Sequence, residues 1–172
     1  MKIKDTFIVV IAVAIFGLLA YVWLSPAGIG PAPDVKFTTL DNRPLTLQSL
    51  QGKPVLVTFW ATSCTGCIKE MPHLVELHNK LAAKGLTIIG VSMAYDPPSH
   101  VTELVTRRQL PYTIAMDIDG SVSRGFGGIK LTPTTFLISP EGRIVMKKIG
   151  DLDMDSLTTR IQYMLTSQQA AL

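Results

Sequence analysis

The chain of 172 residues has few of the residues that build metal sites and disulfide scaffolds: two cysteines, Cys64 and Cys67, and three histidines. A structural zinc site needs about four ligands, commonly two pairs of Cys or His, and only one close pair exists here. A single pair also cannot form the several bridges of a disulfide-rich scaffold. We therefore expect no bound metal and no other cofactor.

Charge is scarce as well, since Asp, Glu, Lys and Arg together make up 17% of the chain. There are 16 basic and 13 acidic residues, and leaving out Lys2, Lys4 and Asp5 at the N-terminus reduces these to 14 and 12. The remainder is nearly neutral and contains no basic run. Nucleic-acid binding is therefore not indicated.

A long apolar run lies near the N-terminus. Residues 7–24, FIVVIAVAIFGLLAYVWL, include no charge. At about 1.5 Å per residue they can cross a hydrocarbon core of about 30 Å, and they exceed the about 7–15 apolar residues of a signal peptide. The lysines in residues 1–6 favour a cytoplasmic N-terminus, so we expect a transmembrane anchor with the rest of the chain outside the cytoplasm. Cleavage at Ser25-Pro26-Ala27 is the alternative, and it too would export the domain.

Residues 25–33 are rich in Pro, Gly and Ala, which is typical of a short linker. Residues 34–172 then form one domain of ordinary size.

The hydrophobic pattern of this domain predicts alternating strands and helices. Residues 53–61 and 86–94 are continuous apolar runs, as in strands buried on both faces, and residues 65–84 between them have helical periodicity. This βαβ unit requires parallel strands. The other predicted elements are a small hairpin within 35–53, a helix over 100–109, a strand at 112–117, a helical segment at 121–127, a hairpin of strands 134–139 and 143–150, and a helix over 154–167. The expected fold class is α/β, with a mixed central sheet and helices on both faces.

The spacing of the two cysteines favours redox chemistry over a structural bridge. A disulfide that closes so short a loop restricts the unfolded chain little. Cys64 falls where the strand gives way to the helix, and free N–H groups and the helix dipole stabilise a thiolate there. Thiols in such positions have pKa values of about 3.5–7.5 instead of about 8.5. We expect Cys64 to be the nucleophile and Cys67, one helical turn further on, to be the less exposed resolving thiol.

Other polar residues give weaker signals. Glu70 shares a helical face with Leu74, and a half-buried carboxylate there could exchange protons with Cys67, although most helical glutamates are simply solvated. The fragment Asp117-Ile118-Asp119-Gly120 resembles the start of a calcium loop, but its glycine comes too early, so a turn that caps a helix is expected. The three histidines, His73, His78 and His100, are expected on solvated faces or edges.

The ordered combination of FWA, C-x-x-C, KEMP and TPTTFLI resembles the membrane-anchored TlpA/ResA-like branch of the thioredoxin family. The resemblance implies a thioredoxin-like fold and an extracytoplasmic thiol-disulfide oxidoreductase. We expect the protein to be a monomer. It makes Cys64 the attacking thiol, Cys67 the resolving thiol and Glu70 an aid to proton transfer. It also makes Pro133 a cis-proline, whereas base rates for X–Pro bonds favour trans.

The resemblance also implies the surroundings of the site and the partners. The residues expected to meet a substrate are Thr132, Pro133, Trp60, Ser63, Thr65 and Gly66. The expected partners are exported proteins with disulfides, including apocytochromes during cytochrome c maturation, and a membrane electron donor.

Two features depart from the family pattern. Ser63 stands where relatives usually carry Trp, and Thr65-Gly66 lacks the proline common between the cysteines. Ser63 removes a large apolar surface where partners dock, so the choice of partner stays open. Thr65-Gly66 affects how well the helix start stabilises the thiolate, so the redox potential stays open. A disulfide-donating oxidase and a copper-handling assembly factor on the same fold remain alternatives, although the latter resembles C-x-x-x-C proteins with a distant ligand histidine.

Overall fold

The computed structural model describes residue 11, residues 13–17 and residues 29–169. Residues 11 and 13–17 are helical and exposed, and the rest of the predicted anchor lies outside the described residues, as do residues 1–6 and 25–28. No helix in the described part is long and apolar enough to span a membrane.

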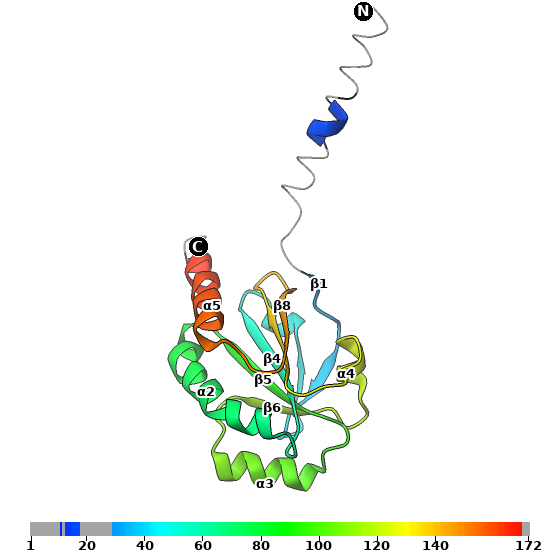
Figure 1. Ribbon diagram of the computed structural model, residues 1–172, viewed down its shortest axis with the longest axis vertical. Coiled ribbons are helices and arrows are strands. Elements are labelled where there is room, and N and C mark those ends of the chain that lie inside the picture. Colours follow the sequence, from blue (N-terminus) through cyan, green and yellow to red (C-terminus); the bar gives the residue numbers. More distant parts are fainter. Residues whose placement is uncertain (1–10, 12, 18–28, 170–172) are drawn as a thin grey trace, which may run out of the picture.

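The domain is a six-stranded mixed sheet with helices on both faces (Figure 1), as predicted for an α/β thioredoxin-like fold. The strands are β1 (Gly30–Pro31), β4 (Val55–Trp60), β5 (Thr87–Ser92), β6 (Thr113–Met116), β7 (Thr134–Ile138) and β8 (Arg143–Ile149), in the spatial order β1-β8-β7-β4-β5-β6. The predicted leading hairpin is a separate two-stranded sheet of β2 (Lys36–Thr38) and β3 (Pro44–Thr46), followed by a 3-10 turn, Gln48–Leu50.

The parallel β4–β5 pair and the antiparallel β7–β8 hairpin confirm the predicted directions. β4 and β5 run parallel, as do β5 and β6, whereas β7 is antiparallel to both β4 and β8. The β7–β8 hairpin turns at Gly142, whose φ of +75° suits glycine.

The helices are α2 (Thr65–Leu81), α3 (Pro98–Arg108), α4 (Ser121–Gly125) and α5 (Met154–Gln169). α2 ends before a 3-10 turn, Ala82–Lys84, and Gly85 in the left-handed region closes this turn. The predicted helix over 65–84 was therefore one 3-10 turn too long, although its glycine stop was correct. Helix α3 begins two residues earlier than predicted.

One short strand was missed. Gly30–Pro31 pairs with Ile144 and Arg143 of β8, and the Ala32 N–H donates to the Gly142 carbonyl oxygen. The sheet thus includes residues that we assigned to the linker 25–33. Proline and glycine obscured this strand because they are depleted in strands elsewhere.

The central strand β4 is buried along its whole length because both faces of the sheet are covered. Leu56 and Trp60 point toward the side chains of α2, α3 and α5, whereas Val57 and Phe59 point toward α4 and the β2–β3 hairpin. Two apolar clusters, one on each face, therefore hold β4 in place. The carboxyl end of this strand carries the site.

Candidate active site

Cys64 lies in the connection between β4 and α2, at the first position before the helix. Its backbone is extended, and its Sγ accepts a hydrogen bond of 3.1 Å from the Cys67 N–H. The sulfur therefore satisfies one of the N–H groups that a helix leaves unpaired at its start. The same contact would stabilise negative charge on Cys64.

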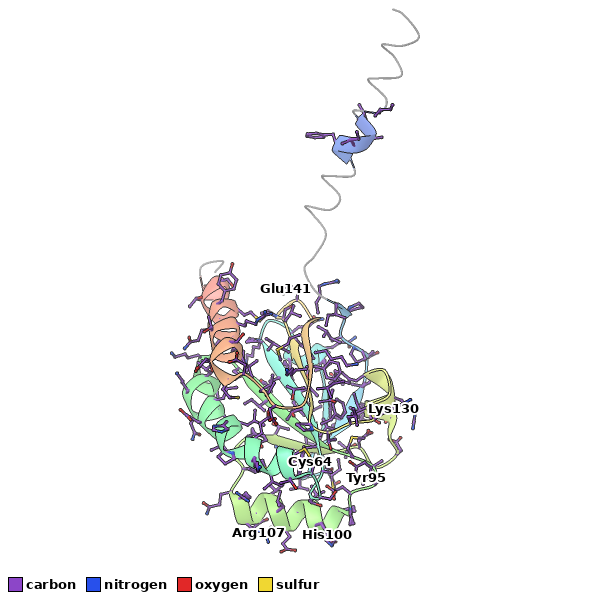
Figure 2. The ribbon with its side chains drawn as sticks, in the orientation of Figure 1. Cys64, Tyr95, His100, Arg107, Lys130 and Glu141 are labelled. Carbon is purple, nitrogen blue, oxygen red and sulfur yellow. A yellow bond between two sulfur atoms is a disulfide. The ribbon has the colours of Figure 1, made fainter. Side chains whose placement is uncertain are left out.

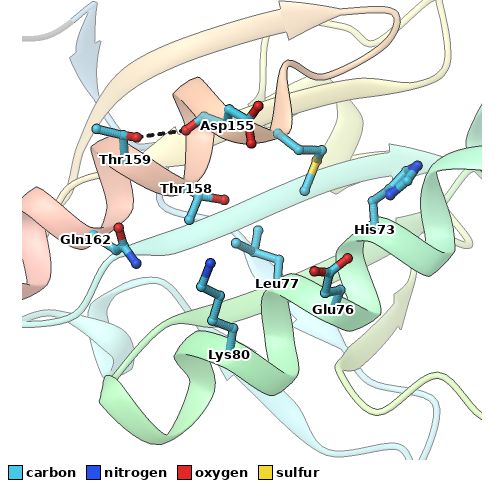
Figure 3. A pocket seen from close by; sticks show the side chains of 9 residues that line it. His73, Glu76, Leu77, Lys80, Asp155, Thr158, Thr159 and Gln162 are labelled. Carbon is cyan, nitrogen blue, oxygen red and sulfur yellow. Dashed lines mark hydrogen bonds between the residues drawn. The ribbon is translucent and has the colours of Figure 1, made fainter.

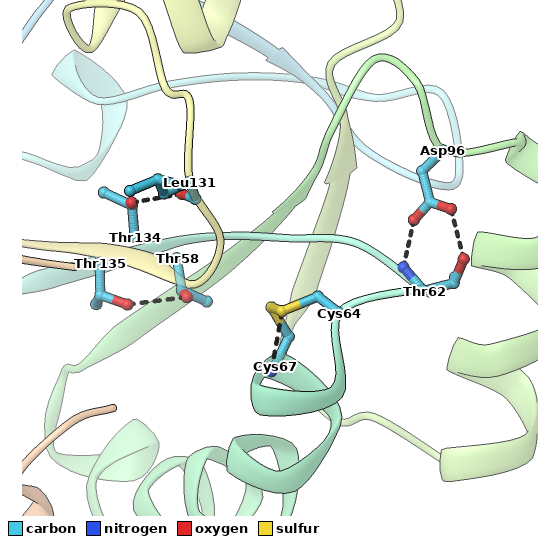
Figure 4. Close-up of a disulfide and its surroundings, with 8 residues drawn as sticks. All are labelled: Thr58, Thr62, Cys64, Cys67, Asp96, Leu131, Thr134 and Thr135. Atoms are coloured by element: carbon cyan, nitrogen blue, oxygen red, sulfur yellow. Dashed lines mark hydrogen bonds between the residues drawn. A yellow bond between two sulfur atoms is a disulfide. The ribbon is translucent and has the colours of Figure 1, made fainter. Parts of the chain in front are cut away.

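The two cysteines form a disulfide, with Cα atoms 5.3 Å apart (Figure 4). Cys64 is partly exposed, whereas Cys67 is 3% exposed and packs in the core cluster of α2. This difference agrees with the predicted accessible and protected thiols. An incoming partner can reach only the Cys64 side of the bridge readily.

The connection before Cys64 is fixed by a residue that the sequence analysis did not identify. The buried carboxylate of Asp96 accepts hydrogen bonds from the N–H and the hydroxyl of Thr62. Asp96 follows β5, and the carboxyl ends of neighbouring parallel strands meet at one edge of a sheet, so its position after a strand was an available signal.

The loop before β7 meets the first turn of α2. The Thr132–Pro133 bond is cis, as the resemblance implied. A Cβ on Gly66 would lie 3.6 Å from Pro133 Cδ, which places the residue before Cys67 directly against this proline. Pro133 is buried and Thr132 is partly exposed.

Glu70 lies under the disulfide on the buried face of α2 and is 7% exposed. Its Oε1 accepts a hydrogen bond of 3.0 Å from the Leu152 N–H. Burial raises the pKa of Glu70 and the carboxylate of Asp151 raises it further, whereas the Leu152 hydrogen bond and the nearby His73 lower it. The net pKa lies above the ordinary value, which makes the carboxylate a better proton acceptor.

Glu70, Cys67, Trp60 and Tyr112 line a small void of about 10 Å³. Burial raises the pKa of Tyr112, and the charge of Glu70 raises it further, so its hydroxyl stays neutral. The Trp60 Nε1 is buried without a hydrogen-bond partner, and the side chain is 3% exposed. The prediction that Trp60 meets a substrate was therefore wrong: apolar packing on α2 draws this ring beneath the site.

The rim around Cys64 is formed by several loops. Ser63 and Thr65 are exposed, as a substrate-facing position requires, and Gly66 is partly exposed. Two large apolar side chains are exposed on these loops: Tyr95, which is 64% exposed and follows β5, and Leu131, which is 62% exposed and precedes the cis-proline. Figure 2 shows Cys64 and Tyr95 near one end of the domain and Glu141 at the other.

The histidines do not gather at the cysteines. His73 lines a polar groove of about 430 Å³ between α2 and α5, together with Glu76, Lys80 and Asp155 (Figure 3). His100 is exposed on α3, whereas His78 is partly buried and its Nδ1 has no hydrogen-bond partner. Among the described residues, no three His, Cys, Asp or Glu side chains lie close enough to hold a metal ion.

The Asp117–Gly120 fragment is a helix-capping turn. The Asp117 carboxylate accepts from the N–H groups of Val122 and Ser123 at 2.9 and 2.8 Å, and Asp119 accepts from Ser121. Both carboxylates are engaged with the first turn of α4, as predicted.

Comparison with known proteins agrees with this geometry. The model of the Redoxin family matches residues 30–161, which is more than half of the chain. The chain belongs to the Redoxin family. It is 33% identical over 126 residues to the "Thiol-disulfide oxidoreductase ResA" of Bacillus thuringiensis subsp. konkukian, covering 73% of this chain and 72% of that protein.

Two further relatives extend the comparison. The chain is 31% identical over 145 residues to "Protein DipZ" of Mycobacterium bovis, covering 79% of this chain and 21% of DipZ. The crystal structure of a thioredoxin-family thiol:disulfide interchange protein from Chlorobium tepidum superposes with a TM-score of 0.72 at 27% identity, covering 82% of this chain and 99% of that one. With the Cys64–Cys67 pair, these relatives identify the chain as a thiol-disulfide oxidoreductase of the thioredoxin-like fold.

Proposed function

We propose that the chain is a membrane-anchored protein-disulfide reductase that acts outside the cytoplasm, with Cys64 and Cys67 as its dithiol. The observation that carries this proposal is the unequal setting of the two sulfurs. Cys64 is accessible at the start of α2, whereas Cys67 is buried above a carboxylate whose pKa is raised. A structural disulfide would need neither the accessible sulfur nor the buried acid.

The reaction uses the two thiols in sequence. The Cys64 thiolate attacks one sulfur of a substrate disulfide, and the first substrate thiol leaves. Cys67 then gives its proton to Glu70, and its thiolate attacks Cys64 Sγ, so the second substrate thiol leaves and the Cys64–Cys67 disulfide forms. The substrate gains two electrons and two protons, and a membrane electron donor returns the protein to the dithiol.

The substrate is expected to lie along the loop before β7. Thr132 supplies backbone groups to an extended segment, Pro133 and Gly66 form the floor, and Ser63 and Thr65 border the disulfide. Exposed Tyr95 and Leu131 would cover apolar parts of the partner. Such a surface suits an unfolded or extended protein segment that carries a cysteine pair.

The chain order supports the location. The apolar run of residues 7–24 would anchor a monomer, with residues 1–6 in the cytoplasm and the domain of residues 34–172 in the periplasm or outside the cell. In that compartment the natural substrates are exported proteins. Apocytochromes awaiting haem are one such group, and a relative named thiol-disulfide oxidoreductase supports disulfide exchange with such proteins.

The test is the redox equilibrium of the full chain in detergent, titrated against glutathione with thiol labelling as readout. A potential near about −270 mV, as in thioredoxin, would support a reductase. A potential near about −120 mV would make the protein a disulfide donor, and a pair that does not titrate reversibly would leave a structural bridge.

A further inference from the structure

The short loop of residues 150–152 contacts both the cis-proline loop and helix α2. The Gly150 N–H donates to the Pro133 carbonyl oxygen at 2.9 Å, and the Leu152 N–H donates to Glu70 Oε1 at 3.0 Å. Asp151 lies between these two hydrogen bonds. The backbone on either side of this aspartate is therefore held against the cis-proline loop and against α2.

Asp151 is aimed at the first turn of α2. A Cβ built on Gly66, between the two cysteines, would lie 3.8 Å from Asp151 Oδ1. The first turn of α2 carries no acidic residue of its own. The loop before α5 supplies a carboxylate beside that turn. An acid at this place interacts favourably with the helix dipole, and it competes there with a thiolate on Cys64.

Asp151 shares its surroundings with two basic side chains but forms no ion pair with either. Lys69 and His73 of α2 line the same groove of about 230 Å³, together with Glu70. The ion pairs formed by the described residues are Arg43–Asp41 and Arg107–Glu103, and neither involves Asp151. On its inner side Glu70 faces the neutral hydroxyl of Tyr112.

We propose that Asp151 is a positioning residue of the redox site: its carboxylate, on a loop whose backbone is held on both sides, opposes negative charge on Cys64 and on Glu70, which makes the dithiol a better electron donor. The inference rests on the proposed function only in that the dithiol reacts through a Cys64 thiolate. The same carboxylate raises the pKa of Glu70, which agrees with this direction. Electron donation improves because a less stable thiolate makes the reduced form less stable.

Small residues between the cysteines are part of this arrangement. Gly66 leaves the approach to the helix open, and a side chain at this position would stand between Asp151 and the first turn. The Thr65-Gly66 dipeptide and Asp151 are thus expected to set the redox properties together.

The experiment compares Asp151→Asn, Asp151→Glu and the matched control Glu141→Gln, which removes one exposed charge at the far end of the domain. Each is made in the full chain, in detergent, with Cys67→Ala so that Cys64 alone is labelled. The rate of alkylation by iodoacetamide is followed from pH 4 to pH 10. Because Asp151 is exposed and water screens its charge, Asp151→Asn is expected to increase the acid dissociation constant of Cys64 only about threefold.

A second readout uses the intact dithiol. At pH 9, Asp151→Asn is expected to shift the equilibrium with glutathione toward the reduced protein by about the same factor. The Asp151→Glu and Glu141→Gln variants should both behave as the wild type. The difference should shrink in 1 M salt, where the Debye length is about 3 Å.

Two results would overturn the proposal. An Asp151→Asn profile that coincides with that of Glu141→Gln would show that the carboxylate does not act on the site. An Asp151→Glu variant that behaves like Asp151→Asn would assign the effect to the shape of the loop. The redox equilibrium of the wild type with glutathione tests the proposed reductase function. The difference between the Asp151 variants tests the role of Asp151. Either proposal can therefore fail while the other holds.

Discussion

The carboxylate of Asp96 accepts hydrogen bonds from both the N–H and the hydroxyl of Thr62, the former at 2.6 Å. Thr62 lies two residues before Cys64, and Asp96 lies in the loop between β5 and α3. A side chain from one loop thus fixes the backbone that leads into the disulfide. These hydrogen bonds are partly buried, so removal of the Asp96 carboxylate takes the acceptor away from two Thr62 donors.

Asp96→Ala should lower the free energy of unfolding by about 1–3 kcal/mol, since two donors lose their acceptor. It should also slow the reaction of Cys64 with a substrate disulfide, because the connection before α2 is released. Urea denaturation and stopped-flow kinetics measure the two effects. Thr62→Ser, which keeps both donors, is the control. If Asp96→Ala and Thr62→Ser have the same free energy of unfolding and the same Cys64 reaction rate, the role of Asp96 is contradicted.

The two cysteines should differ in a trapping experiment. Cys67→Ala keeps the accessible thiol and lacks the resolving one, so it should accumulate a mixed disulfide with a reducible protein substrate. Cys64→Ala leaves a thiol that is 3% exposed and should accumulate almost none. Non-reducing gel electrophoresis followed by mass spectrometry identifies the adduct. The reverse pattern would exchange the two roles.

Glu70→Gln should slow the attack of Cys67 on the mixed disulfide by about 100-fold, the lower end of general acid–base effects. In the wild type this step should accelerate as pH rises through the raised pKa of Glu70, and the variant should lose that acceleration. Rapid-quench measurement of substrate release at each pH gives the profile. An unchanged profile would make Glu70 a structural residue.

The same carboxylate predicts a pH-dependent difference in stability. Burial raises the pKa of Glu70 above 4.5, so folding favours its neutral form, and the corresponding stability is lost as pH rises through the folded-state pKa. Glu70→Gln should therefore equal the wild type in urea denaturation at pH 4 and exceed it at pH 8. Glu76→Gln, which changes an exposed residue on the same helix, should show no such divergence.

Much of this site could be predicted from the sequence because local patterns determine it. The continuous apolar run of β4 and the periodicity of α2 place Cys64 at a helix start with Cys67 below it, and the antiparallel β7–β8 hairpin follows from its Gly turn. The cis state of Pro133 needed the family pattern, because X–Pro bonds are rarely cis in general.

The remaining features depend on contacts between distant segments. The Asp96–Thr62 pair spans 34 residues and the Glu70–Leu152 hydrogen bond spans 82, and no local pattern encodes either partner. Trp60 was misplaced for a related reason. Its position beside the cysteines indicated a surface role, whereas packing against α2 buries it.

A side chain on Gly90 is expected to destabilise the fold, because Gly90 packs against Trp60 and Tyr112, two residues that line the void of the site. A Cβ there would meet Ile114 Cδ1 at 3.0 Å and both Trp60 Nε1 and Tyr112 Cε2 at 3.2 Å. Gly90→Ala should therefore lower the free energy of unfolding by about 1–3 kcal/mol, as overpacked cores do. Gly30→Ala is the matched control, since a Cβ on this strand glycine meets nothing within 4 Å. Urea denaturation measures the free energy of unfolding of both variants. Equal values would mean that the Trp60 and Tyr112 rings move aside without cost. The void lined by Cys67 would then be adaptable and not a fixed part of the site.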